Sequence, residues 1–153
     1  MQPYYTDYFN NLLELHNDLR SALAELPQEA LDWSPQGGMN SLAVLVVHLT
    51  GAQRYWLGDV LAGEPSARNR EAEFTVSGIS LEALLQRLAE SEYYSHQVLE
   101  RLSLSDLEQT RISPRNNRQV SVGWALAHVL KHTALHLGHA QITRQLWDNQ
   151  NKV

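Results

Sequence analysis

Four of the seven histidines in this chain lie close together near its C-terminal end, at His128, His132, His136 and His139. If this stretch is helical, all four fall within an arc of roughly 80°, because each residue turns the helix by about 100°. Side chains four residues apart have Cβ atoms about 5–6 Å apart. Two imidazoles at that spacing can bind one metal ion through bonds of roughly 2.0–2.1 Å. The pattern therefore indicates a metal site on one helix face.

A third ligand has to come from another helix, and His48 is the best candidate. It lies in an apolar segment among Val44, Leu45 and Ala52. An unpaired buried imidazole is costly, and a metal ion would give it a partner. We therefore predict that His48, His132 and His136 bind one divalent metal ion.

Other interpretations remain open for the remaining histidines. The pairs His128/His132 and His136/His139 also have spacings that suit a metal ion. Alternatively, His128 and His139 support the ligands from outside the coordination sphere or face solvent. A single helical histidine is most often a hydrogen-bonded core or boundary residue, and we interpret His16 and His96 in that way.

Several catalytic chemistries are excluded by missing residues. The chain has no cysteine, which excludes disulfides, thiolate metal sites and a cysteine nucleophile. The segment from His132 to His136 lacks the glutamate that zinc peptidases place between two such histidines. A glycine-rich phosphate loop, a dinucleotide-binding fingerprint and a nucleophile elbow are also absent. Thiol chemistry, if it occurs, requires an external thiol.

Helical periodicity predicts the elements that position these residues. Apolar residues recur every three or four positions in four segments, which we place at about 4–26, 41–61, 81–102 and 121–148. Asn40 or Ser41 is a suitable N-cap for the second helix, as are Ser80 and Ser121 for the third and fourth. We find no credible strand pairing, so we expect one all-α domain over residues 1–153, a four-helix bundle. The longer connections before the third and fourth helices would allow a crossover.

Composition favours a globular protein of the cytoplasm. The chain has 153 residues, 43% hydrophobic and 19% charged, with a net charge of −5. No basic face indicates a nucleic-acid partner. The first ten residues lack the features of a signal peptide, and the longest apolar run, Leu42–Val47, is too short to span a membrane.

Two stretches resemble the DinB/YfiT-like superfamily. One leads from Ser41 through His48 to Leu57, and the other runs from His128 to His139 with the pattern His-x-x-x-His-x-Gly. The resemblance implies a metal-binding four-helix bundle with up-down-down-up connectivity, often homodimeric. It implies zinc, nickel or iron at His48, His132 and His136. Relatives often have glutamine where this chain has His139, and many have histidine where it has Leu135.

The resemblance also implies a class of reaction. Some members transfer low-molecular-weight thiols, and others have been proposed as metal-dependent hydrolases. Three neutral imidazoles leave a coordination position open, as in catalytic zinc sites. An ion there would deprotonate a bound thiol, or lower the pKa of a bound water toward about 7.

Three functions follow as hypotheses. The first is a metal-dependent thiol S-transferase with a small-molecule substrate. The second is a hydrolase that uses a metal-bound hydroxide, with His128 or His139 as general base. The third is a non-enzymatic metal-binding stress-response module, which a site sealed by Trp56 and Trp124 would support. Tyr55 is a candidate lining residue of a substrate cleft. Arg111, Arg115 and Arg118 form a basic loop that would suit an anionic cosubstrate.

Overall fold

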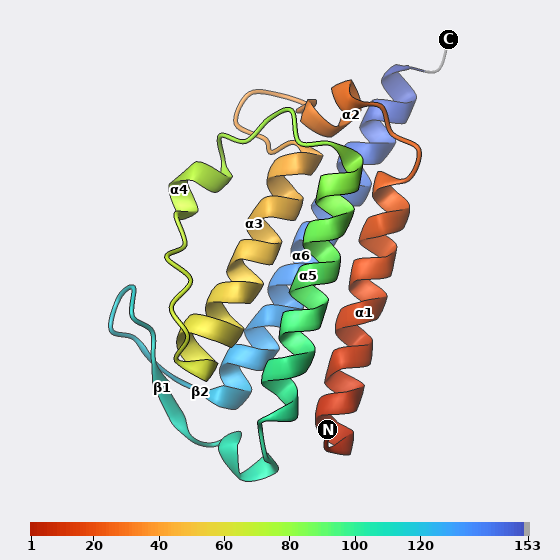
Figure 1. Cartoon of the computed structure of the whole chain (residues 1–153). Helices are drawn as coiled ribbons and strands as arrows, with labels where there is room; N and C mark the ends of the chain where they lie inside the picture. The colour runs from red at the N-terminus through yellow and green to blue at the C-terminus, as the bar shows by residue number, and fades with distance from the viewer. Residues whose placement is uncertain (152–153) are drawn as a thin grey trace.

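Four long helices form a bundle in the computed structural model, which describes residues 1–151 (Figure 1). They are α1 (Pro3–Leu23), α3 (Leu42–Arg54), α5 (Leu81–Glu100) and α6 (Val122–Gln150). A π-helical segment, η1 (Tyr55–Ala62), continues α3. In Figure 1, α1 and α6 run upward while α3 and α5 run downward. The predicted four-helix bundle and its up-down-down-up connectivity are confirmed.

Serine side chains cap three of these helices as the sequence predicts. Ser41, Ser80 and Ser121 each accept a hydrogen bond from the backbone N–H three residues further on. Each cap satisfies one of the N–H groups that lack a partner in the first helical turn. The helix ends are less accurately predicted, since α1 stops at Leu23 and α5 stops at Glu100.

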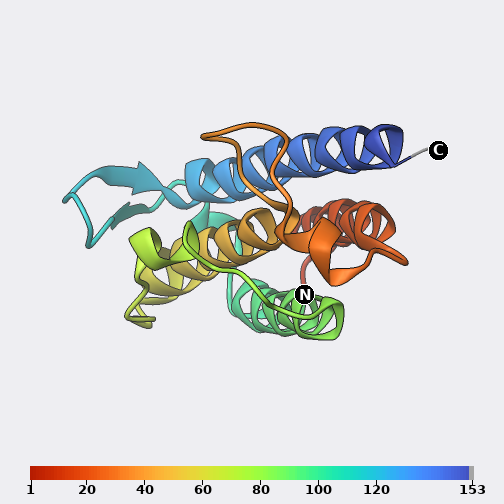
Figure 2. The same ribbon diagram turned by 90° about the horizontal axis from the view of Figure 1, so that it is seen from above.

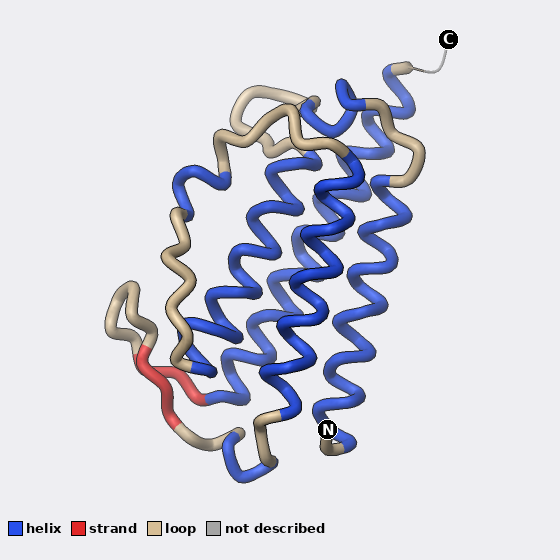
Figure 3. Tube along the Cα trace, viewed as in Figure 1, coloured by secondary structure: helices blue, strands red, loops and turns tan. Residues whose placement is uncertain are grey.

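The expectation that no strands pair was wrong. β1 (Thr110–Ile112) pairs antiparallel with β2 (Gln119–Ser121), and the resulting hairpin leads into α6 (Figure 3). Three-residue strands are too short to show the alternation of apolar and polar residues that identifies a strand. The chain also forms a short 3₁₀ helix, η2 (Leu104–Asp106), ahead of the hairpin.

Two short helices lie in the connections between the long ones. α2 (Gln28–Asp32) follows α1, and α4 (Arg70–Glu73) lies within the crossover from η1 to α5. The crossover runs back along α3 and brings α4 against that helix (Figure 2). The connection between η1 and α5 therefore contributes side chains to the bundle.

Within residues 1–151 the interior contains two apolar clusters and a buried polar network around His16. His16 is fully buried, with Nδ1 2.9 Å from Glu92 and Nε2 3.1 Å from Gln53. Its interpretation as a hydrogen-bonded core residue is confirmed. His96 is a boundary residue that packs on Phe9.

Part of the apolar sequence of α6 faces outward. Leu135, Ile142 and Leu146 are 55%, 52% and 41% exposed. They follow one another at spacings of seven and four residues, so they share one face of the helix. Among residues 1–151, no helix combines the length and apolar character that crossing a membrane requires.

Candidate metal centre

Three histidines from two helices converge inside the bundle. His48 lies on α3, and His132 and His136 lie one turn apart on α6. The ring centroid of His48 is 5.0 Å from that of His132 and 4.9 Å from that of His136. One potential ligand atom from each histidine lies within 4.8 Å of the other two. The structure therefore brings together the three residues that the sequence proposes as ligands.

The donor atoms suit a small divalent cation. The two Nε2 atoms of His132 and His136 are 3.2 Å apart. Two ligands of a tetrahedral zinc ion are about 3.3 Å apart when each bond is about 2.0–2.1 Å. Nδ1 of His136 is buried without a hydrogen-bond partner among the described residues. All three donors are imidazole nitrogens, which suit zinc, nickel and iron.

A carboxylate orients the His48 ring. Nδ1 of His48 lies 2.9 Å from Oε2 of Glu73, which α4 brings to α3. When Nδ1–H donates this hydrogen bond, Nε2 is left with its lone pair for a metal ion. A carboxylate behind a metal-binding histidine fixes the ring and raises its basicity. His48 is thus held in the tautomer that a ligand requires.

Arg68 in turn holds Glu73. Its Nε binds Oε1 of Glu73, and its Nη2 binds Oε2 at 2.7 Å. Burial raises the pKa of the Glu73 carboxyl, but hydrogen bonds from Arg68 and His48 outweigh this effect and leave the pKa below its usual value. Glu73 is therefore ionised at neutral pH. The result is a chain of contacts from Arg68 through Glu73 to His48.

Gly51 allows Glu73 to approach α3. A Cβ at position 51 would overlap Oε1 of Glu73 and lie 3.0 Å from its Cδ. The carboxylate can reach His48 only because position 51 has no side chain.

We expect Gly51→Ala to push Glu73 away and weaken zinc binding by about tenfold, the lower end of the effect of losing such a carboxylate. Competition titration with a zinc chelator measures this affinity. Gly138→Ala is the matched control, because a Cβ at that α6 position would meet no atom within 4 Å. Equal affinities in the two variants would contradict the proposed role of Glu73.

Burial keeps the two histidines of α6 neutral. Desolvation, followed by the charges of neighbouring histidines, lowers the pKa of His132 to about 3 and that of His136 to about 4. Neutral imidazole is the form that binds metals. Both imidazoles are therefore in the form that could bind a metal ion well below neutral pH.

The same shifts predict how stability depends on pH. Unfolded histidine titrates near pH 6.5, so between there and about pH 3 the unfolded chain binds more protons at these sites than the folded chain. The contribution of these two histidines to the free energy of unfolding is fully present above pH 6.5 and is lost as the pH decreases. We expect metal-free protein to show a lower free energy of unfolding in urea at about pH 5.5 than at about pH 7.5. His132→Asn should reduce this difference, and an unchanged difference would contradict the prediction.

The other predicted residues lie around the trio. The His128 ring stacks on Trp124 at 4.9 Å and contacts Trp56, and its centroid is 5.7 Å from that of His132. His139 is exposed, with its ring 5.4 Å from that of His136. Tyr55 is buried, and its hydroxyl lies 2.6 Å from Oγ of Ser113 in the hairpin connection. None of these three belongs to the cluster of potential ligands.

Sequence reasoning missed Glu73, Arg68 and Phe74. The Phe74 ring packs 4.7 Å from that of His48. Asn69 caps α4 by accepting a hydrogen bond from the N–H of Ala72. An asparagine with acidic residues after it does signal a helix start. That local signal could have located α4, but it does not place α4 beside α3.

Comparisons with known proteins identify the family of this chain. The model of the DinB superfamily matches residues 11–140. The chain therefore belongs to the DinB superfamily. A search of curated proteins finds no significant match.

Two solved structures share the fold. A conserved protein from Enterococcus faecalis superposes with a TM-score of 0.82 at 16% identity, over 97% of this chain and 99% of that one. YfiT from Bacillus subtilis superposes with a TM-score of 0.77 at 15% identity, over 97% of this chain and 90% of that one. YfiT is described as "a probable metal-dependent hydrolase with an unusual four-helix bundle topology".

Proposed function

We propose that this protein is a metal-dependent enzyme in which His48, His132 and His136 hold one divalent ion. We further propose that it transfers a low-molecular-weight thiol to a small electrophile. The observation that carries the proposal is the convergence of three imidazoles, one of them oriented by Glu73. A divalent ion held there would supply Lewis acidity, which makes a thiol or a water nucleophilic near neutral pH.

The protein's own residues prepare the site. Glu73 fixes the tautomer of His48, and burial keeps His132 and His136 neutral. The side chains of His132 and His136 remain partly exposed. Trp56 and Trp124 pack against each other and against His128. Because His132 and His136 remain partly exposed, the site favours an enzyme over a sealed, non-enzymatic metal module.

A cavity next to the hairpin suits an anionic cosubstrate. This hairpin cavity has a volume of about 650 Å³, and its lining includes Tyr55, three arginines (Arg68, Arg70 and Arg115) and the acidic residues Asp59 and Glu71. Asp59 pairs with Arg54, and Glu71 lies 3.4 Å from Arg70 at the exposed rim. Arg70 lies over the ring of Phe74, which contacts His48. Of the basic loop predicted from the sequence, Arg115 lines this cavity. We propose that Arg70 and Arg115 bind the carboxylates of the thiol.

The test is thiol transfer by zinc-loaded and nickel-loaded protein. Bacillithiol, mycothiol and glutathione are each supplied with 1-chloro-2,4-dinitrobenzene, in which the thiolate sulfur forms a bond to the ring carbon and chloride leaves. We expect turnover with at least one thiol and none with His132→Ala. Arg115→Gln should raise the KM for bacillithiol or glutathione, whose carboxylates mycothiol lacks. Absence of transfer with all three thiols would exclude this reaction.

Hydrolysis is the second candidate, because the fold neighbour YfiT is described as a hydrolase. His128 would be the general base, since its Nδ1 is buried without a hydrogen-bond partner among the described residues. Burial also lowers its pKa. Ester and amide substrates are assayed with His128→Gln, His139→Gln and the double variant. Turnover that survives the double substitution would eliminate this mechanism.

We also propose a cytoplasmic homodimer that pairs through the exposed apolar face of α6. Leu135, Ile142 and Leu146 form this face, and such a stripe on a helix suits pairing with a second copy. Light scattering coupled to size-exclusion chromatography measures the mass. We expect a dimer that Ile142→Glu converts to monomer, whereas a monomeric wild-type protein would contradict the proposal.

A further inference from the structure

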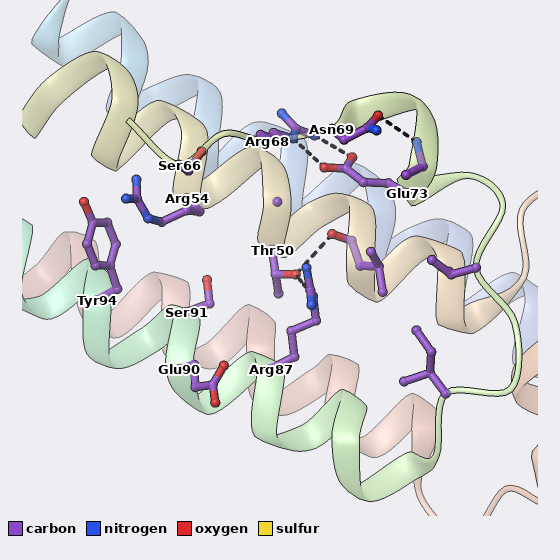
Figure 4. Close-up of a pocket in the computed structure, with 15 residues that line it drawn as sticks. Thr50, Arg54, Ser66, Arg68, Asn69, Glu73, Arg87, Glu90, Ser91 and Tyr94 are labelled. Atoms are coloured by element: carbon purple, nitrogen blue, oxygen red, sulfur yellow. Dashed lines mark hydrogen bonds and ion pairs between the residues drawn. The ribbon is translucent and has the colours of Figure 1, made fainter. Parts of the chain in front are cut away.

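A second cavity lies next to Glu73. This α3–α5 cavity has a volume of about 580 Å³ and is bounded by α3, α5 and the crossover that carries α4 (Figure 4). Ligand pockets commonly have volumes of about 300–1,000 Å³. None of His48, His132 and His136 lines it, whereas Glu73 does. Both oxygens of Glu73 are already bound by Arg68 and His48.

Three arginines line this cavity, and they differ in their partners. Arg54 binds Asp59, and Arg68 binds Glu73. Arg87 donates from Nε to the hydroxyl of Thr50 at 3.0 Å. Among the described residues, its two terminal nitrogens have no hydrogen-bond partner, and no carboxylate pairs with it. Arg87 therefore offers two parallel donors, the arrangement that binds a carboxylate in a bidentate manner.

A buried hydroxyl next to Arg87 is also unsatisfied. Oγ of Ser91, one turn further along α5, is buried and has no hydrogen-bond partner within residues 1–151. In Figure 4, the side chains of Arg87 and Ser91 extend from α5 toward α3. Buried polar atoms almost always have a partner. A ligand oxygen in this cavity would give Ser91 one.

Apolar side chains also line this cavity. Val47 of α3 lines it, as do Val76 and Ile79 of the crossover. Glu90 lines it too, and its carboxylate pairs with Gln86. The cavity therefore combines apolar side chains with the two unpaired terminal nitrogens of Arg87. The nearby negative charge of Glu90 disfavours a dianion.

We propose that the α3–α5 cavity binds a small monocarboxylic acid with an apolar body. Its carboxylate binds the terminal nitrogens of Arg87 and the hydroxyl of Ser91. Its body packs on Val47, Val76 and Ile79. This site shares Gly51, Arg68 and Glu73 with the surroundings of the metal centre but none of the three histidines, and its occupancy does not depend on the function proposed above.

The test uses 3-phenylpropionate as the probe and ¹⁵N-labelled full-length protein as the target. Saturable amide shifts should appear at Thr50, Gly51 and Ser91. The neutral 3-phenylpropionamide and the dianionic phenyl phosphate should each bind at least about tenfold more weakly, because a charge-assisted pair with Arg87 is lost or opposed by Glu90. Arg87→Gln should weaken 3-phenylpropionate binding by about tenfold.

Two control variants show whether binding is specific to this cavity and independent of the metal centre. Arg111→Gln removes a partly exposed arginine outside the cavity and should leave binding unchanged. His132→Ala should also bind the acid normally, so a failure of the metal proposal leaves this result intact. Shifts that do not saturate by about 10 mM acid, about tenfold above a Kd of about 1 mM, would overturn the proposal.

Three further results would contradict it as well. The first is a set of shifts centred away from the cavity, and the second is equal affinity for the acid and the amide. The third is tighter binding of phenyl phosphate, because the site would then accept a dianion despite Glu90.

Discussion

Replacing His132 with alanine is expected to weaken zinc binding by at least about a hundredfold and to remove stoichiometric metal from the purified protein. The ring centroid of His132 lies 4.4 Å from that of His136 and 5.0 Å from that of His48. The variant keeps two imidazoles on different helices, which is fewer than the three protein ligands typical of catalytic zinc sites. Elemental analysis and a chelator competition titration measure the loss.

His139→Ala is the matched control for this substitution. His139 lies on the same helix, yet it is exposed and stands outside the cluster of potential ligands. It should retain one metal ion per chain and the wild-type affinity. Urea unfolding of both metal-free variants shows whether the fold survives. Full metal content in a folded His132→Ala variant would refute the assignment of this residue.

Replacing Glu73 with glutamine should weaken zinc binding by about 10- to 100-fold, the range seen when a residue behind a metal ligand is lost. Glutamine keeps an oxygen that accepts from Nδ1 of His48, but it removes the negative charge that makes the imidazole a stronger donor. It also leaves the guanidinium of Arg68 without its carboxylate partner. Isothermal titration of zinc into the metal-free variant measures the change.

Glu71→Gln tests whether the effect is specific. Glu71 belongs to the same short helix, and its side chain is 84% exposed. This variant removes the same charge from α4 without touching the histidines. If both substitutions weaken zinc binding equally, the effect comes from net charge, and the contact with His48 has no special role.

The sequence predicts the bundle because its signals are local and repeated. Ser41, Ser80 and Ser121 identify three helix starts through hydrogen bonds that span only three residues. The hairpin of β1 and β2 gives no comparable signal, because two three-residue strands hardly differ from loop. The outward-facing positions of Leu135 and Ile142 could not be predicted either. Periodicity identifies apolar faces, but it does not say whether the same chain covers them.

The candidate site was predictable only where residues share a helix or lie among apolar neighbours. His132 and His136 follow from their spacing, and His48 follows from the cost of burying an imidazole without a partner. Glu73 lies 25 residues from His48 along the chain, in a segment without regular periodicity. Its role depends on how the crossover folds back over Gly51. That is a tertiary contact, and no pattern in one sequence encodes it.

The most direct test of the metal centre is zinc K-edge X-ray absorption on protein loaded with one equivalent of zinc, beside the His132→Ala variant. We expect a single shell with nitrogen scatterers at about 2.0–2.1 Å and the multiple-scattering pattern of three imidazoles, reduced to two or fewer in the variant. A wild-type spectrum without imidazole scattering, or one that the variant leaves unchanged, would contradict the convergence of His48, His132 and His136 on one ion.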